Sequence, residues 1–499
     1  MSTTEGIQDA LGPPDETYRP DRPNILMLFS DEHHWRYTGY AGHPVVQTPN
    51  LDRLASRGVT FTNAYCNAPL CSPSRQSFMA GLYPHRIGMW NNCCSMPENT
   101  VTWAHALSRA GYETMLCGKM HFNGYQRMYG FDRRPVLEGN NYGQQFYSWG
   151  RRTSHDWTWE YPFERRGGIS TLRQAGPDSD ARQPIFQHDL RVTGGVMDVL
   201  REKADEESGR PWALCVGHVL PHPPFTPRRD LWDRYEGAGL DADNPWGEGL
   251  GECDRSIRAY IGLHTNDYTV ADLRRLRAAY YGLVTEYDEH VGRILDCLAE
   301  TGLADNTIVL YFSDHGEMCG EHGFVGKVSL RESSSRVPLL VSWPGRFPEG
   351  LEAPALVSLV DLYPTFLEIA GTRLPEPLPL DGRSLLPLLD GREDPAGGDR
   401  TVFCEFEGEG WNHPRCFLRD GDYKYVINHT SAPELYDVVS DPLEMDNLVG
   451  RPETAAREAQ IRERILDWWD PEAIEVEVLR TQARQKLARC RNVCGDLGW

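Results

Sequence analysis

Long apolar segments are missing from this sequence. It contains no run of about 20 apolar residues, the length of a spanning helix. Residues 1–21 are polar and rich in proline and acidic side chains, with no basic segment leading into an apolar one. The pattern therefore predicts neither a transmembrane helix nor a secretory signal peptide. We expect a cytoplasmic protein without a membrane partner.

Positive charge is also scarce. The 499 residues include 51 Lys and Arg against 72 Asp and Glu, which gives a formal net charge of −21. A chain with this excess of negative charge is repelled by the phosphate backbone, so we do not expect a nucleic acid partner. The balance still permits a local cationic pocket for a small anion.

Two Cys/His pairs that together match zinc-finger spacing are absent as well. The thirteen cysteines are an odd number, and neither Cys93-Cys94 nor Cys490 with Cys494 has a second Cys/His pair nearby. In a reducing compartment we expect most of these residues to be core thiols.

The sequence does contain the pattern of an α/β protein. With 40% apolar residues it can bury the core of one large domain and a smaller one. Apolar runs at residues 24–29, 112–117, 211–218 and 307–312 are typical of strands buried on both faces of a parallel sheet. We also predict helices at 103–110, 270–301 and 452–469, a strand at 59–65, and a small antiparallel sheet from 401–407, 417–419, 423–427 and 434–437.

Polar side chains stand at the ends of the four buried runs: Asp31 and Glu32, Lys119 and His121, His218, and Asp314 with His315. Ligands of open α/β sheets bind at the carboxyl ends of strands. Acids from two separate strands supply the charge that a divalent ion needs, and a neutral imidazole can face the same ion. Taken singly, each of these residues also fits an ordinary loop position.

A single cysteine precedes a helix start in Cys71-Ser72-Pro73-Ser74-Arg75. Pro73 suits the first turn of a helix, and the residues that follow can hold an anion near its positive end. From these five residues alone, a buried unreactive cysteine is an equally good interpretation.

The longer stretch resembles the signature of the type I sulfatases, a formylglycine-dependent family of the alkaline phosphatase superfamily. The cysteine motif is followed by Gly-Leu-Tyr-Pro-His-Arg at 81–86, and Pro-Asn-Ile-Leu, Thr-Pro-Asn-Leu-Asp-Arg-Leu and Phe-Thr-Asn-Ala-Tyr precede it in the family's order. The resemblance covers residues 22 to about 448. It implies a large mixed sheet sandwiched by helices, with a smaller C-terminal α+β domain.

The resemblance also implies a site. A formylglycine-generating enzyme would convert Cys71 to Cα-formylglycine, whose hydrated aldehyde attacks sulfur, and a divalent ion, calcium in preference to manganese, would bind the same group. The implied metal ligands are Asp31, Glu32, Cys71, Asp314 and His315. The implied catalytic residues are Cys71, Arg75, Lys119, His121, His218 and Lys327, and Asn92 is a candidate for binding substrate.

Two of these positions depart from many arylsulfatases. Glu32 replaces the usual second aspartate, which puts its role as a ligand in doubt. The Asp314-His315 pair is similar to that of choline sulfatases, iduronate-type sulfatases and phosphonate monoester hydrolases. Hydrolysis of sulfate monoesters is therefore the predicted reaction. A phosphonate monoester or phosphodiester hydrolase, and a non-catalytic anion-binding protein, are the alternatives.

We predict four parts of the chain: a polar extension (1–21), a catalytic domain (22–390), a small-sheet domain (400–470) and a tail (471–499). Within the catalytic domain, residues 125–183 contain Trp149, Trp157 and Trp159 and have poor periodicity, so we expect an insertion near the pocket. The tail is a candidate contact surface for a homo-oligomer.

Overall fold

The computed structural model describes residues 22–490, apart from residues 125, 139–166, 178–182, 239–245, 264–267, 375–377, 395–399 and 409–412. The three tryptophans of the predicted insertion, Cys494 and the predicted extension lie outside the described residues.

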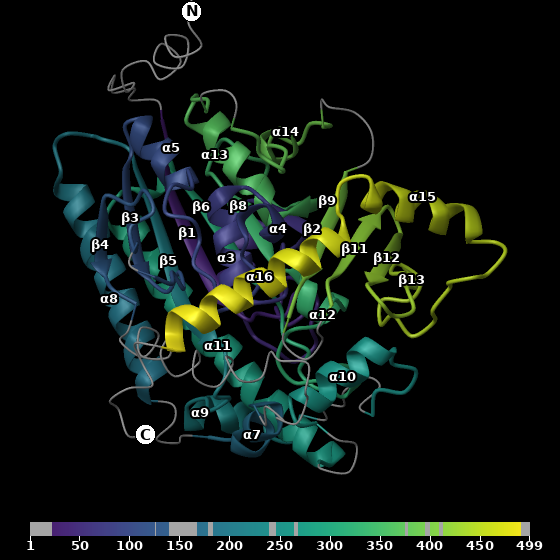
Figure 1. Ribbon diagram of the computed structural model, residues 1–499. Helices are drawn as coiled ribbons and strands as arrows, with labels where there is room; N and C mark the ends of the chain where they lie inside the picture. Colours follow the sequence, from purple (N-terminus) through teal and green to yellow (C-terminus); the bar gives the residue numbers. More distant parts are fainter. Residues whose placement is uncertain are drawn as a thin grey trace, which may run out of the picture.

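A mixed sheet forms the centre of the large domain (Figure 1). Among the described residues it has nine strands in the order β4-β3-β5-β1-β6-β8-β2-β7, and β9 also pairs with β2. The pairs within β4-β3-β5-β1-β6 are parallel, whereas β8 is antiparallel to β6. The strands are β1 (Asn24–Asp31), β2 (Val59–Tyr65), β3 (Glu113–Gly118), β4 (Arg133–Val136), β5 (Trp212–Pro221), β6 (Thr307–Ser313), β7 (Arg336–Val337), β8 (Leu339–Ser342) and β9 (Leu351–Ser358).

Helices cover both faces of this sheet, which explains why every residue of β1 is buried. Phe78 of α3 packs against Phe312 of β6, whereas Tyr287 of α11 packs against the adjacent Tyr311. Successive strand residues point to opposite faces, so α3 and α11 lie on opposite sides. The helices include α2 (Pro49–Ser56), α3 (Cys71–Ala80), α4 (Pro84–Ile87), α5 (Trp103–Arg109), α7 (Gly167–Gln174), α8 (Gln183–Asp205), α9 (Arg229–Tyr235), α10 (Glu252–Tyr260), α11 (Val270–Glu300), α12 (Glu332–Ser335), α13 (Leu362–Ile369) and α14 (Leu386–Leu389).

The order of the strands assembles the site. Because β3, β5, β1 and β6 are neighbours and parallel, their carboxyl ends meet at one edge of the sheet. This edge carries Asp31 from β1 and the residues that follow β3 and β6.

The C-terminal domain is a separate antiparallel sheet, β10-β11-β12-β13, covered by α15 (Ala455–Leu466). Its strands are β10 (Thr401–Phe406), β11 (Arg415–Asp420), β12 (Tyr423–Asn428) and β13 (Glu434–Asp437). The backbone N–H of Glu405 donates to the carbonyl of Asn67 at 3.1 Å, so β10 lies against the loop that leads to Cys71. These features confirm the predicted fold class.

Two segments differ from the sequence argument. β4 lies inside the predicted insertion, yet it continues the main sheet beside β3. The predicted tail begins with a helix, α16 (Pro471–Cys490), which crosses the front of the view in Figure 1. Ile474 and Val478 of α16 are buried, and Trp90 Nε1 donates to Thr481 Oγ1 at 3.3 Å. α16 therefore packs on its own chain, and the oligomer contact stays a prediction.

Candidate functional site

Cys71 is the first residue of α3 and is 2% exposed. The backbone N–H of the next residue, Ser72, donates to Asn92 Oδ1 at 2.8 Å. Asn123 Nδ2 in turn donates to the carbonyl of Asn92 at 2.8 Å and to that of Cys94 at 2.7 Å. Asn92, predicted as a substrate contact, therefore holds the amino end of the helix that carries Cys71.

Four buried side chains form a cluster that could hold a metal ion. Potential ligand atoms of Asp31, Cys71, Asp314 and His315 all lie within 4.8 Å of one another. His315 Nε2 is 3.2 Å from Cys71 Sγ, and His315 Nδ1 is 3.0 Å from the carbonyl of Gly316. Because a carbonyl only accepts, Nδ1 carries the proton in that bond. Against the effect of burial, Asp314 and Cys71 raise the pKa of His315 to about 9, and loss of the Nε2 proton presents a lone pair to the cluster.

Arg75 joins the two acids of this cluster. Its fully buried guanidinium donates from Nε to Asp314 Oδ2 at 2.8 Å and from Nη2 to Asp31 Oδ2 at 3.2 Å. A third bond runs from Nη1 to the carbonyl of Lys119 at 2.8 Å. The forked guanidinium thus fixes both carboxylates from the side of α3.

Glu32, a predicted metal ligand, lies outside this four-residue cluster. Its Oε2 atom is 2.6 Å from Lys327 Nζ and 3.4 Å from His222 Nε2. The Glu32 backbone is left-handed, with φ of 67°, and its N–H donates to Asp314 Oδ1 at 3.0 Å. A second potential ligand set contains Asp31, Glu32 and His222. In this set, Lys119 already contacts the carboxylate of Asp31, and Lys327 contacts that of Glu32. We therefore interpret Glu32 as a partner of Lys327.

Two lysines, Lys119 and Lys327, act on Cys71 electrostatically. Lys119 Nζ hydrogen-bonds Asp31 Oδ2. Burial alone would raise the pKa of the Cys71 thiol, but Lys327 and Lys119 hold that pKa well below its ordinary value. A group that replaces this thiol therefore stands in a strongly cationic environment.

His121 lies beside the start of α3. Its backbone has φ of 59°, its N–H donates to Glu138 Oε1 at 3.1 Å, and its carbonyl accepts from Ser72 Oγ at 3.3 Å. A hydrogen bond from the His121 side chain also favours the ionised form of Cys71. The structure thus brings His121 to the cysteine, as the sequence predicts.

Of two histidines near the end of β5, His222 rather than His218 lies beside the cluster. His218 Nε2 bonds Thr193 Oγ1 at 3.0 Å, and its ring lies 5.5 Å from that of Tyr287, beneath the helices α8 and α11. Burial lowers the pKa of His218 to about 3, so the ring is neutral. The predicted anion contact of His218 is therefore not what the geometry shows. His222, which the sequence argument did not include among the site residues, lies beside Glu32 and Asp31 instead.

Two family models match this chain. "Sulfatase" matches residues 23–372, and "N-sulphoglucosamine sulphohydrolase, C-terminal" matches residues 320–470. No helix within the part of the chain that the structure describes is long and apolar enough to cross a membrane.

Curated relatives are similar over most of their length. The choline-sulfatase of Rhizobium meliloti (strain 1021) is 34% identical over 478 residues, which is 93% of this chain and 90% of that protein. Arylsulfatase K of Rattus norvegicus is 31% identical over 449 residues, 85% of this chain and 74% of that protein.

Solved structures share the fold. The phosphonate monoester hydrolase of Agrobacterium radiobacter has a TM-score of 0.72 at 25% identity and covers 89% of this chain and 95% of its own. A protein solved in complex with its substrate D-glucosamine-2-N,6-O-disulfate has a TM-score of 0.71 at 23% identity, over 94% of this chain and 99% of its own.

Proposed function

Since this chain belongs to the sulfatase family and is a sulfuric ester hydrolase, we propose that its nucleophile is a formylglycine made from Cys71 and that a divalent ion binds beside it. The observation that supports this most strongly is the buried cluster of Asp31, Cys71, Asp314 and His315 at the amino end of α3.

The donor set fits a divalent ion. Asp31 and Asp314 provide carboxylate oxygens, His315 provides Nε2, and the residue at position 71 adds an oxygen once it is modified. Hard oxygen donors suit calcium, and one imidazole also suits manganese. We propose calcium in the first place. Together, formylglycine and the ion supply an oxygen nucleophile that is ionised near neutral pH.

The chain's own residues hold the sulfate group. The ammonium groups of Lys119 and Lys327 and the imidazole of His222 surround position 71, where they can bind the non-bridging oxygens of a sulfate ester. Fixed cations in a buried pocket stabilise charge that develops on such oxygens during transfer. Arg75 orients Asp31 and Asp314 through its ion pairs with both carboxylates.

His121 handles a proton in this proposal. Its side chain hydrogen-bonds the group at position 71, and it can take a proton from a hydroxyl there when sulfate is released. Asn92 and Asn123 do not touch the reacting atoms in this proposal. They position the first turn of α3.

The maturation step is the direct test. Protein made with a formylglycine-generating enzyme, the proposed maturation partner, is digested, and the peptide containing position 71 is analysed by mass spectrometry. We expect the mass of formylglycine, and Cys71→Ala should show no turnover. Active protein whose peptide carries only unmodified cysteine would disprove the nucleophile.

A phosphonate monoester hydrolase is the second candidate, favoured by the 25% identity and fold of the Agrobacterium radiobacter enzyme. The same cluster and cations could act on a phosphonate. We place sulfate monoesters first because three cationic or imidazole groups match three equivalent oxygens, whereas a phosphonate carries carbon in place of one.

A further inference from the structure

A second polar cavity lies where the large domain meets the C-terminal sheet. It has a volume of about 560 Å³ and is lined by Tyr83, Ser358, Asp361, Asp381, Arg383, Arg400, Thr401, Phe403, Leu418, Arg464, Asp467 and Trp468. Tyr83 follows the carboxyl end of α3, whereas Cys71 begins that helix. A ten-residue helix is about 15 Å long. The cavity is therefore separate from the metal cluster.

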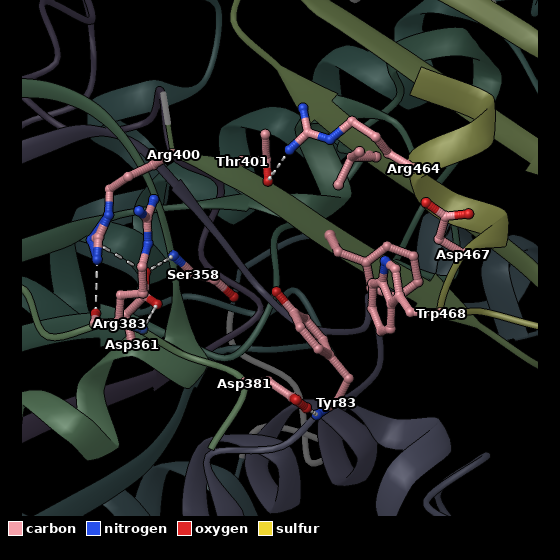
Figure 2. Close-up of a pocket in the computed structure, with 12 residues that line it drawn as sticks. Tyr83, Ser358, Asp361, Asp381, Arg383, Arg400, Thr401, Arg464, Asp467 and Trp468 are labelled. Atoms are coloured by element: carbon pink, nitrogen blue, oxygen red, sulfur yellow. Dashed lines mark hydrogen bonds and ion pairs between the residues drawn. The ribbon is translucent and has the colours of Figure 1, made fainter. Parts of the chain in front are cut away.

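Guanidinium groups occupy one side of this cavity. Figure 2 shows Arg383 and Arg400 close together there. Arg400 is 6% exposed, and its Nη2 donates to the carbonyls of Arg383 and Ser384 at 2.8 and 3.2 Å. Its Nη1 atom has no hydrogen-bond partner among the described residues and lies 4.0 Å from the Asp361 carboxylate, whereas its Nε atom pairs with Asp394 Oδ2 at 3.1 Å. A buried cation with a free donor is a strong site for an anion.

Two acids of the lining, Asp361 and Asp381, are already engaged, whereas Asp467 is exposed. Asp361 accepts the backbone N–H of Arg383 at 2.7 Å and that of Ser358 at 2.9 Å. Asp381 accepts the N–H of Tyr83 at 2.9 Å and pairs with Arg86. Asp394, which does not line the cavity, lies 3.1 Å from Arg400 Nε and 3.6 Å from Arg383 Nη1, so the Nη1 donor of Arg400 is the part of this pair that remains for an anion.

An aromatic surface occupies the other side. Trp468 is 42% exposed, and its ring centroid lies 4.4 Å from that of Phe403 and 5.6 Å from that of Tyr83. Arg464 lies nearby, with Nη2 3.4 Å from Thr401 Oγ1 (Figure 2). An exposed indole beside hydroxyl, carboxylate and guanidinium groups can stack on the apolar face of a sugar ring and bond its hydroxyls.

We propose that this cavity binds a sugar that carries an anionic group such as sulfate or phosphate. The anionic group contacts Arg383 and Arg400, and the sugar ring lies against Trp468. Binding there does not depend on the chemistry at Cys71, so the proposal stands or falls separately from the nucleophile.

Calorimetric titration of the full-length Cys71→Ala protein tests the proposal without turnover. The probes are glucose 6-sulfate, glucose 6-phosphate, glucose and inorganic sulfate. We expect the two esters to bind at least about tenfold more tightly than glucose or inorganic sulfate. The ratio of the dissociation constants of glucose 6-sulfate and glucose 6-phosphate identifies the preferred anion. Equal binding of glucose, or of inorganic sulfate, would overturn the assignment.

Variants locate the bound sugar. Arg383→Gln and Trp468→Leu change partly exposed side chains, and each should weaken ester binding about tenfold. Arg392→Gln removes an exposed charge that does not line the cavity, and it should leave binding unchanged. If Arg383→Gln and Trp468→Leu bind like the parent, or if Lys327→Gln abolishes binding, the ester occupies the catalytic pocket and the proposal is wrong.

Discussion

Lys327 Nζ lies 2.6 Å from Glu32 Oε2, and this contact joins the end of β1 to the loop after β6. Glu32 fixes the position of a cation beside position 71, and it does so from a left-handed residue directly after Asp31, a proposed metal ligand. Asp31 and Glu32 are adjacent in sequence, yet Asp31 belongs to the four-residue cluster whereas Glu32 pairs with Lys327.

Glu32→Gln should retain the metal ion of the parent protein. We expect kcat/KM to fall about tenfold, because Lys327 loses the carboxylate that positions its ammonium group. Elemental analysis of the purified protein measures the ion, and steady-state kinetics measures the rate. A variant that loses its metal would restore Glu32 to the ligand set.

Asp314→Asn is the matched change within the metal cluster. It removes a charge that Arg75 and the ion both use, so we expect most of the bound ion to be lost. The rate should fall by several orders of magnitude, because the ion activates and orients the nucleophile. Full metal content with full activity would show that the ion lies elsewhere.

His218 within β5 and His222 directly after it should differ in kinetics. His222→Gln removes a group beside the sulfate position, and kcat/KM should fall about ten- to a hundredfold. His218→Gln disturbs the bond with Thr193, so it should lower the melting temperature with little effect on kcat. The reverse pattern would return the anion contact to His218.

Substrate preference can be measured with matched esters. We expect kcat/KM to be higher for 4-nitrophenyl sulfate or choline sulfate than for 4-nitrophenyl phenylphosphonate or bis-4-nitrophenyl phosphate. Each cation left without an oxygen partner costs roughly 1–3 kcal/mol, or about ten- to a hundredfold in rate. A lead of more than about tenfold for the phosphonate or the diester would favour the second candidate function.

A remote carboxylate gives a pH-dependent prediction. Asp288 of α11 accepts the N–H of Leu51 at 2.8 Å, and burial raises the pKa of Asp288 from 3.8 to about 6. Between these values the folded state holds a proton that the unfolded state lacks, so this group's contribution to stability falls as pH rises. From pH 5 to 7 the loss should be about 1 kcal/mol.

Denaturant unfolding of the parent and of Asp288→Asn at several pH values measures this contribution. The difference in unfolding free energy between the two proteins should shift with pH in the stated direction. A constant difference would mean that Asp288 titrates normally in the folded protein.

The buried strands and the cysteine helix could be predicted because their signals are local. Continuous apolar runs identify β1, β3, β5 and β6, and their parallel order brings Asp31 and Asp314 together. The direction in which a side chain points depends on packing against distant segments, so the local sequence does not predict it. His218 and His222 follow the same apolar run, and only the packing of α8 against β5 decides which of them turns away from the cluster.

Residues far apart in sequence set the remaining features. The role of Glu32 depends on Lys327, which comes from another loop, and no spacing rule connects the two. α16 was missed because its buried apolar residues, such as Ile474 and Val478, are few and are separated by charged residues, and because its bond with Trp90 joins residues far apart in sequence. The cavity at Arg400 joins segments of both domains, so no single motif could predict it.

The burial of Cys71 determines when in the life of the chain it can be modified. In the folded protein Cys71 is 2% exposed, and the preceding loop is bonded to β10, which is synthesised much later. An enzyme that needs access to the cysteine backbone must therefore act on a nascent or incompletely folded chain. If Cys71 becomes formylglycine as proposed, modification competes with folding, and a host in which translation outpaces the modifying enzyme would accumulate well-folded protein that is permanently inactive.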